Sequence, residues 1–164
     1  VDAVAPPPYT WREVVEATRR LHPWDLVVQE YGRTNPALLK GLRTLGASVT
    51  PLPVYRWTLP EDLGPLTEAV EKLASGRFDV VLFTTPAHVV NLFEVAARFG
   101  REQAVRSALA GAVVGSIGPA TSEMLAEYGV EPDVEPAESK MGVLVWEVAQ
   151  RAGEVRERKR ARLE

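Results

Sequence analysis

Val114-Gly115-Ser116-Ile117-Gly118-Pro119-Ala120-Thr121 joins a stretch with the character of a β-strand to one with the character of a helix. The apolar residues 112–117 predict the strand, and residues 120–128 predict the helix that follows it. Gly118 allows close approach of the backbone, and Pro119 suits the first turn of a helix, where its missing N–H would have no partner. The stretch therefore predicts a strand, a tight turn and a helix, the repeating element of a parallel sheet.

Outward from this junction, strand and helix signals alternate with short connections. The apolar run at residues 78–83 predicts a strand buried on both faces, whereas Pro51 and Pro53 cannot donate to a ladder and predict an edge strand. We therefore expect an α/β fold with a flavodoxin-like parallel five-stranded sheet, in the order 2-1-3-4-5, and helices on both faces. The predicted strands are residues 25–29, 48–55, 78–83, 112–117 and 130–134, and the helices between them are residues 36–45, 63–74, 87–99 and 120–128.

The two ends of the chain differ from this alternating middle. Three successive prolines in residues 1–8 favour an extended linker, and Thr10 then caps a short helix over residues 11–21 that ends at His22-Pro23. Residues 141–152 again show helical spacing, but this helix need not pack on the sheet. Residues 156–162 contain five basic residues and are expected to be a solvated helix end, with contact to an anionic partner as the alternative.

The composition narrows the class of protein. Hydrophobic residues make up 46% and charged residues 25% of the 164 residues, as in globular proteins, and no apolar run approaches the roughly 18 residues of a membrane helix. The lack of cysteine excludes disulfides and thiolate metal sites, and two histidines are too few for a His-rich metal site. The net charge of −3 gives no general attraction to nucleic acid. We therefore expect a cytoplasmic protein with neither nucleic-acid nor membrane partners.

Ligands of an open α/β sheet bind at the carboxyl ends of its strands, where helix N-termini present unpaired amides. The first such junction here is residues 30–36, in which Gly32 frees the backbone and Arg33 supplies a cation. It predicts either a well-capped helix or an anion site in which amides and Arg33 hold a carboxylate.

The next two junctions carry hydroxyl groups. In Thr84-Thr85-Pro86-Ala87-His88, Thr85 suits a helix N-cap, and the two hydroxyls also suit a carboxylate or an amide of a ligand. His88 is either a solvated first-turn residue or a donor to substrate. At the third junction, Gly118, Pro119 and Thr121 predict a platform of amides and a hydroxyl. The spacings of dinucleotide, Walker and serine-elbow motifs are absent, so neither nucleotides nor serine hydrolysis are supported.

Four segments of this sequence match motifs of a known protein family, in the same order and with similar spacing. A tyrosine ending the second strand is matched by Leu52-Pro53-Val54-Tyr55-Arg56, and a Phe-Thr/Ser-Ser/Thr-Pro/Ala stretch by Phe83-Thr84-Thr85-Pro86. An Ile-Gly-Pro-x-Thr motif followed by Leu, Gly and Pro is matched by residues 117–121, Leu125, Gly129 and Pro132. Ser139-Lys140-Met141-Gly142-Val143-Leu144 is similar to a Thr-x-x-Gly-Leu segment. Together these segments resemble the uroporphyrinogen-III synthase family.

The resemblance implies a fold of two similar α/β domains, joined by a two-stranded hinge, with the active site in the cleft between them and one domain largely missing here. Residues 1–22 are then the linker and short helix leading from the other domain. Residues 23–136 are the α/β substrate-binding domain, and residues 137–164 are a helix returning toward the other domain, with a charged tail.

The resemblance also implies a reaction. The family cyclises hydroxymethylbilane, a linear tetrapyrrole, to uroporphyrinogen III with loss of water and inversion of the last ring, without metal or organic cofactor. Tyr55 is then the candidate catalytic residue, donating a hydrogen bond to the departing hydroxyl; otherwise it is a tyrosine packed against a helix. The candidate substrate-binding residues are Gly32, Arg33, Thr84, Thr85, Pro86, Ala87, Gly118, Pro119 and Thr121, with Arg56 and Lys140 as further charge partners.

Two other classes of protein stay open. A noncatalytic tetrapyrrole-binding or regulatory module could keep the same fold. An unrelated flavodoxin-like response or sugar-binding domain is disfavoured, because Glu30 stands without an acidic cluster after the first strand. The expected partner is a small-molecule substrate, and a homodimer or pairing with the missing half-domain is possible.

Overall fold

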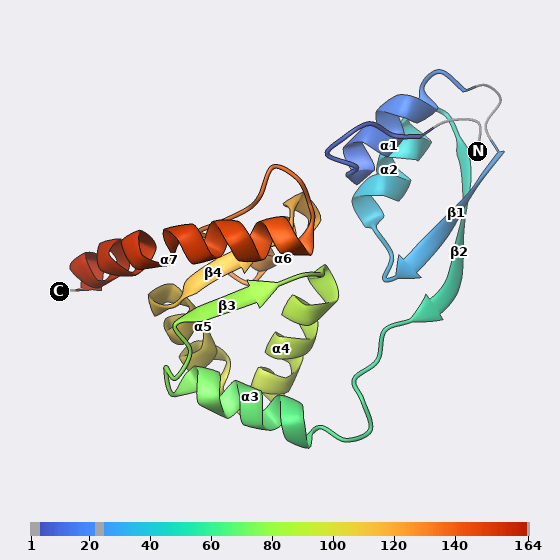
Figure 1. The fold of residues 1–164 in the computed structure, drawn as a ribbon. Coiled ribbons are helices and arrows are strands. Elements are labelled where there is room, and N and C mark those ends of the chain that lie inside the picture. Colours follow the sequence, from blue (N-terminus) through green and yellow to red (C-terminus); the bar gives the residue numbers. More distant parts are fainter. Residues whose placement is uncertain (1–3, 22–24, 164) are drawn as a thin grey trace. The chain divides into compact units, whose positions relative to one another are not determined.

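The computed structural model describes residues 4–21 and 25–163, and the chain divides into two units, Val1–Thr58 (unit 1) and Leu59–Glu164 (unit 2) (Figure 1). The side chains of Tyr31, Tyr55 and Leu163 lie outside this description. The predicted end of the first helix, at His22-Pro23, also lies outside the described residues. The division falls inside residues 23–136, which the sequence predicted as one domain.

Unit 1 contains a two-stranded parallel sheet and two helices. Strand β1 (Asp25–Gly32) pairs with β2 (Ser48–Arg56), in a register that begins at Asp25 opposite Ser48. Helix α1 (Trp11–Thr18) begins with the predicted cap, where the side chain of Thr10 accepts from Arg12 N at 3.2 Å and Glu13 accepts from Thr10 N at 2.8 Å. Among the described residues β1 and β2 pair only with each other, so both are edge strands.

Helix α2 (Pro36–Thr44) connects the two strands and begins as the sequence predicted. Asn35 caps it by accepting a hydrogen bond from Leu38 N at 2.9 Å, and Pro36 occupies the first turn. Leu39 and Leu42, on its inner face, are buried. After the helix, Gly46 turns the chain with a φ of 87°, a left-handed conformation that glycine adopts without strain.

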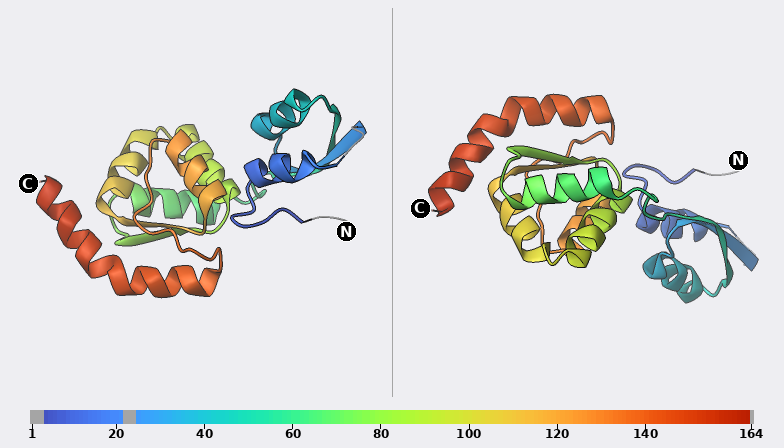
Figure 2. Two further views of the ribbon diagram at one scale, coloured as in Figure 1. Left: turned by 90° about the horizontal axis from the view of Figure 1, so that it is seen from above. Right: turned by 90° about the horizontal axis from the view of Figure 1, so that it is seen from below.

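Unit 2 places helices on both faces of a second parallel sheet, made of β3 (Val80–Phe83) and β4 (Val113–Ser116). Helix α7 (Met141–Leu163) lies along one face, and the other helices lie on the opposite face (Figures 1 and 2). These helices are α3 (Gly64–Ala74), α4 (Pro86–Arg98), α5 (Glu102–Gly111) and α6 (Pro119–Glu127).

The two faces follow from the alternation of side chains along β4. Val114 packs into the larger core, which includes Val89 and Phe93 of α4. Val113, the preceding residue, belongs to a second core formed with α7. This core consists of Val113, Val134, Leu144, Val148 and Val155. Because successive residues of a strand point to opposite faces, a fully buried strand needs apolar side chains at both positions.

The structure does not show the predicted single five-stranded sheet. The described residues form two separate two-stranded sheets, β1 with β2 and β3 with β4. The predicted fifth strand, residues 130–134, is reduced to one bridge between Val134 and Gly115. The expected burial of residues 78–83 on both faces is wrong at their beginning, since Phe78 and Val80 are exposed. Apolar runs indicate where strands form, but they do not encode which strand edges pair.

Two helical segments differ from the prediction. Helix α5 went unpredicted, although Val105 and Leu109 are spaced four apart and both are buried. Its N-cap, Arg101, makes no side-chain cap, so the usual start signal is missing. The sequence indicated helical spacing over residues 141–152, in a helix that need not pack on the sheet, and a solvated helix end over residues 156–162. Helix α7 runs to Leu163 and packs on β4, with Val155 buried.

Candidate functional site

The second and third junctions meet at one edge of unit 2. Phe83, the last residue of β3, pairs with Ser116, the last residue of β4, and Ile117 N donates to Phe83 O at 3.0 Å. The loops that follow the two strands therefore lie side by side. We call residues 84–88 and 117–122 the carboxyl edge of unit 2. The sequence predicted this pairing of junctions from the parallel topology alone.

At the first loop of the carboxyl edge, Thr85 is the N-cap of α4, as predicted, and accepts from His88 N at 3.4 Å. Thr84 Oγ1 lies 3.3 Å from Nδ1 of His88, whose side chain is exposed. Pro86 begins the helix, and Ala87 follows it on the first turn. The loop thus presents a threonine and histidine pair beside a helix N-terminus, where partial positive charge gathers.

At the second loop, Gly118 lies close to the side chain of Ser139. A Cβ atom at Gly118 would lie 2.4 Å from Ser139 Oγ and 3.3 Å from Ser139 Cβ. Residue 118 has extended backbone, so close approach, and not backbone conformation, explains the glycine. The loop of residues 135–140 therefore lies against the start of α6.

Thr121 was predicted to face a crevice from the first turn of α6. The structure places it on that turn, but its side chain is buried. Its amide and that of Ser122 both donate to Gly118 O, at 3.0 and 3.1 Å. Thr121 thus packs beneath the carboxyl edge, while Gly118 and Pro119 form the turn itself.

A serine and glutamate network at this edge was missed from the sequence. Ser116 is fully buried, and its hydroxyl donates to Gly118 O at 3.1 Å. Ser122 Oγ lies 2.8 Å from Ser116 Oγ and also hydrogen-bonds the carboxylate of Glu135. The available signal was a serine closing an otherwise apolar strand, because a buried hydroxyl requires a partner. The network ties β4, α6 and the loop of residues 135–140 together.

Lys140, a predicted charge partner of substrate, follows that loop. Its Nζ lies 2.6 Å from Oε2 of Glu138, and both side chains are exposed. The hydrogen bond and charge of Glu138 raise the pKa of Lys140, and Lys140 lowers the pKa of Glu138 in return. The ammonium group therefore stays protonated at neutral pH beside the carboxyl edge.

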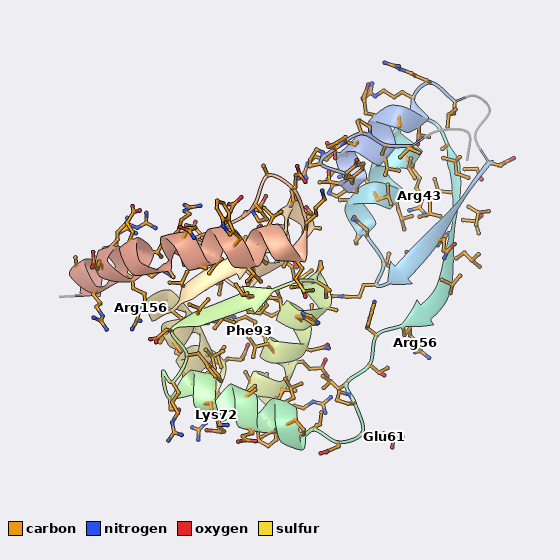
Figure 3. All side chains as sticks on the ribbon, viewed as in Figure 1. Arg43, Arg56, Glu61, Lys72, Phe93 and Arg156 are labelled. Carbon is orange, nitrogen blue, oxygen red and sulfur yellow. The ribbon has the colours of Figure 1, made fainter. Side chains whose placement is uncertain are left out.

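The first junction and Tyr55 belong to unit 1. Gly32 has a φ of 76°, and a Cβ atom there would lie 1.7 Å from Cδ1 of Trp57. Tyr55 lies in β2, its side chain outside the described part, and Arg56 at the end of that strand is paired in register with Gly32 (Figure 3). Arg33 borders a cavity of about 270 Å³, lined by Val28, Gln29, Glu30, Arg33, Asn35, Leu38 and Leu39.

Neither a metal cluster nor a membrane span was found in the residues that the structure describes. No group of three or more His, Cys, Asp or Glu side chains within residues 4–21 and 25–163 is arranged to hold a metal ion. Within the same residues, no helix is both long and apolar enough to cross a bilayer.

Comparison with known proteins identifies the family. Residues 1–145 match the family described as uroporphyrinogen-III synthase HemD. A protein of Methanothermobacter thermautotrophicus, provisionally named a uroporphyrinogen-III synthase, is 33% identical over 129 residues, which are 77% of this chain and 50% of that protein. The uncharacterized protein YjjA of Bacillus subtilis is 33% identical over 141 residues, covering 80% of this chain and 50% of its own. The chain thus spans about half the length of these relatives.

The fold is similar to that of solved enzymes. The wild-type uroporphyrinogen III synthase of the extremely thermophilic bacterium Thermus thermophilus superimposes with a TM-score of 0.57 and 29% identity, over 85% of this chain and 54% of that one. A second structure of the Thermus thermophilus enzyme gives a TM-score of 0.54 and 28% identity, over 84% of this chain and 54% of that one. The family match covers most of the chain and the fold agrees with it: the chain belongs to the uroporphyrinogen-III synthase family.

Proposed function

We propose that this chain is the substrate-binding α/β part of a uroporphyrinogen-III synthase, a lyase that cyclises hydroxymethylbilane to uroporphyrinogen III. The observation that carries the proposal is the carboxyl edge of unit 2. There the family's two loop motifs lie side by side, at the end of a sheet where ligands of α/β proteins bind. The chain spans about half the length of its relatives, so the activity of the whole enzyme is part of this proposal.

The carboxyl edge suits the acidic side chains of a tetrapyrrole. The N-termini of α4 and α6 begin there, and each favours an anion by about 0.3–1 kcal/mol. Thr84 and Thr85 would hydrogen-bond acetate or propionate groups beside Pro86 and Ala87. Gly118 and Pro119 would let a carboxylate approach the N-terminus of α6, with the buried Thr121 supporting that turn from below. Lys140 would pair with a carboxylate near the same loop.

The reaction needs few catalytic groups from the protein, because the pyrrole nitrogen of the substrate assists the departure of the hydroxymethyl oxygen. Tyr55 would donate a hydrogen bond to that oxygen, which leaves as water after taking a proton. Arg33 and Arg56, at the ends of β1 and β2, would hold substrate carboxylates. No metal or organic cofactor enters this reaction.

The proposal also covers the strand order of the sheet, the presence of a second domain and the number of copies of the chain. The five-stranded, flavodoxin-like sheet, predicted for residues 25–134, stays a proposal beside the two two-stranded sheets of the described residues. We also retain a second domain, reached from residues 1–22 and 137–164, and a possible homodimer as the alternative source of a missing half. The enzyme would act in the cytoplasm.

A noncatalytic tetrapyrrole-binding module is the second candidate. The same α/β fold can bind a product without assembling a catalytic site. Turnover separates the two candidates, since the module binds uroporphyrinogen III but forms none.

Binding of product tests the proposed site directly. Titration of the ¹⁵N-labelled chain with uroporphyrinogen III under anaerobic conditions is expected to shift the amide signals of residues 84–88 and 117–122, apart from Pro86 and Pro119, which have no amide N–H. The reason is that carboxylates bound at the carboxyl edge would change the surroundings of these amides. Residues 102–111 of α5 provide the internal control and are expected to stay unshifted. Shifts concentrated in α5, or no saturable shift at the carboxyl edge, would contradict the proposed site.

A further inference from the structure

Helix α7 carries apolar side chains on two opposite faces along its first half. Leu144 and Val148 pack into the core that α7 shares with β4, and they are 0% and 4% exposed. On the outer face, Met141, Val145 and Trp146 are 62%, 48% and 64% exposed. A helix that is apolar on all sides is normally buried, and an exposed apolar patch of this kind marks a surface that binds another molecule.

The second half of α7 has no such patch. Its inner face continues at Val155, which is buried, but most of its exposed positions from Glu154 to Arg162 carry charge. The apolar surface is therefore limited to residues 141–149, a length of about 13 Å along the helix. In both views of Figure 2, α7 lies on the outside of unit 2. We call Met141, Val145, Trp146 and the exposed Ala149 the outer face of α7.

The charges at the two ends of the outer face suit a second copy of the same helix. Lys140 precedes the face, Glu154 follows it, and both are exposed. In an antiparallel pair of α7 helices centred on residue 147, Lys140 of each copy would lie beside Glu154 of the other. Lys140 also contacts Glu138 of its own chain at 2.6 Å, and the three N–H groups of an ammonium can serve both carboxylates.

A parallel pair of the same helices would be unfavourable. It would place like charges opposite each other at Lys140 and at Glu154, and it would bring together the two basic tails of residues 156–162. The antiparallel pair separates these tails. The surface is thus complementary to itself under a two-fold axis, as the interface of a symmetric dimer must be.

The same register brings a large side chain opposite a small one. With residue 147 at the two-fold axis, Trp146 of one copy faces the turn of the other copy that holds Ala149. A small side chain at the contact lets two helices approach to about 8 Å, the short end of the usual range. The indole can then be buried against the partner helix, and tryptophan is one of the side chains that most often carry the energy of an interface.

We propose that the outer face of α7 is the interface of a homodimer, in which two copies pack their α7 helices antiparallel about a two-fold axis near residue 147. Trp146 anchors the contact, and two pairs of Lys140 with Glu154 fix its direction. A contact this short is typical of dimers that dissociate on dilution. The interface lies on unit 2 and is independent of the proposed function, which does not use the outer face.

Sedimentation equilibrium over a dilution series tests the interface. The 164-residue chain is expected to show a monomer–dimer equilibrium, and Trp146→Ala should weaken the dimer about tenfold or more. The matched control is Phe99→Ala, which removes an exposed aromatic side chain outside α7 and should leave the equilibrium unchanged. A chain that stays monomeric at its highest soluble concentration, or a Trp146→Ala variant that dimerises like the unchanged chain, would overturn the proposal.

An exchange of two charges tests the antiparallel direction. Lys140→Glu alone should weaken the dimer, because each interhelical pair then joins two carboxylates. Adding Glu154→Lys to the same chain restores opposite charges across the antiparallel pair, so it should return the dissociation constant to that of the unchanged chain. In a parallel dimer the double exchange would still place like charges opposite each other. Failure of the second substitution to restore dimerisation would therefore contradict the antiparallel arrangement.

Chemical cross-linking gives a direct readout, because the chain has no cysteine of its own. In Ala149→Cys, the thiols of the two copies would lie about 6 Å apart along the helix axes, so a short bismaleimide should join them. Circular dichroism checks that this variant stays folded. Phe99→Cys, outside α7, is the control and should stay a single chain. If the outer face binds a different protein instead, the purified Ala149→Cys chain will not cross-link, and the homodimer is wrong.

Discussion

Replacing Asp133 with alanine is expected to lower the free energy of unfolding of unit 2 by about 3–5 kcal/mol. The substitution leaves the largely buried ammonium group of Lys159 without its carboxylate partner. The side chain of Asp133 is 8% exposed and that of Lys159 is 14% exposed, and Oδ2 lies 2.6 Å from Nζ. Asp133 Oδ2 also accepts from Val114 N at 2.8 Å, and Lys159 donates to Ala112 O at 2.6 Å. The pair therefore joins the far end of α7 to the start of β4 and the residue before it.

An exposed ion pair of similar length gives the matched control. Lys72 Nζ lies 2.7 Å from Oε1 of Glu68, but both side chains are exposed to solvent. Glu68→Ala should therefore leave the free energy of unfolding nearly unchanged, because solvent screens the pair. Urea denaturation followed by circular dichroism measures both variants. If Asp133→Ala is no more harmful than Glu68→Ala, the pair does not hold α7 in place.

Phe93→Ala should cost about 3–5 kcal/mol of unfolding free energy, because it empties the centre of the larger core of unit 2. Phe93, labelled in Figure 3, is 1% exposed. Its ring stacks on that of Tyr128, with the ring centroids 4.5 Å apart. The guanidinium of Arg106 lies 4.9 Å from the Phe93 ring centroid, a cation–π contact that the substitution also removes. Urea denaturation of the purified variant gives the change in free energy.

Phe99, one residue beyond the end of the same helix, provides the control for Phe93. It is exposed, so Phe99→Ala should change stability by about 0.5 kcal/mol or less. Phe93→Leu should fall between the two alanine variants, because it keeps much of the buried volume but loses both ring contacts. Similar losses at positions 93 and 99 would mean that the packing of this core is not as described.

Local features of the fold were predictable because their signals lie within a few residues. Thr10 caps α1, Asn35 and Pro36 begin α2, and Thr85 and Pro86 begin α4. Each depends on side-chain hydrogen bonds to the nearest backbone amides, or on the fixed φ of proline. The carboxyl edge of unit 2 was predictable for a related reason, since parallel strands end at the same side of a sheet.

Features that join distant residues were not predictable in this way. The basic tail was expected to be solvated, yet Lys159 meets Asp133, and Arg156 Nη2 lies 2.7 Å from Oδ1 of Asp79. Nothing in the local pattern of residues 156–162 encodes partners more than twenty positions away. Glu30 is a similar case, because an isolated glutamate in a strand sequence does not show that the residue is buried. It also does not show that Oε1 has no hydrogen-bond partner among the described residues. The spacing of charged residues shows which side of a helix carries the charge. Which residues that side contacts depends on how the helix packs in the folded chain.

The decisive measurement is the conversion of freshly prepared hydroxymethylbilane, with the type III and type I isomers of the product separated. The chain is expected to form uroporphyrinogen III faster than the spontaneous reaction forms type I. Tyr55→Phe is expected to lower this rate about 10²-fold, since the departing hydroxyl loses its hydrogen-bond donor. Formation of type I alone, at the spontaneous rate, would contradict the synthase activity of this chain.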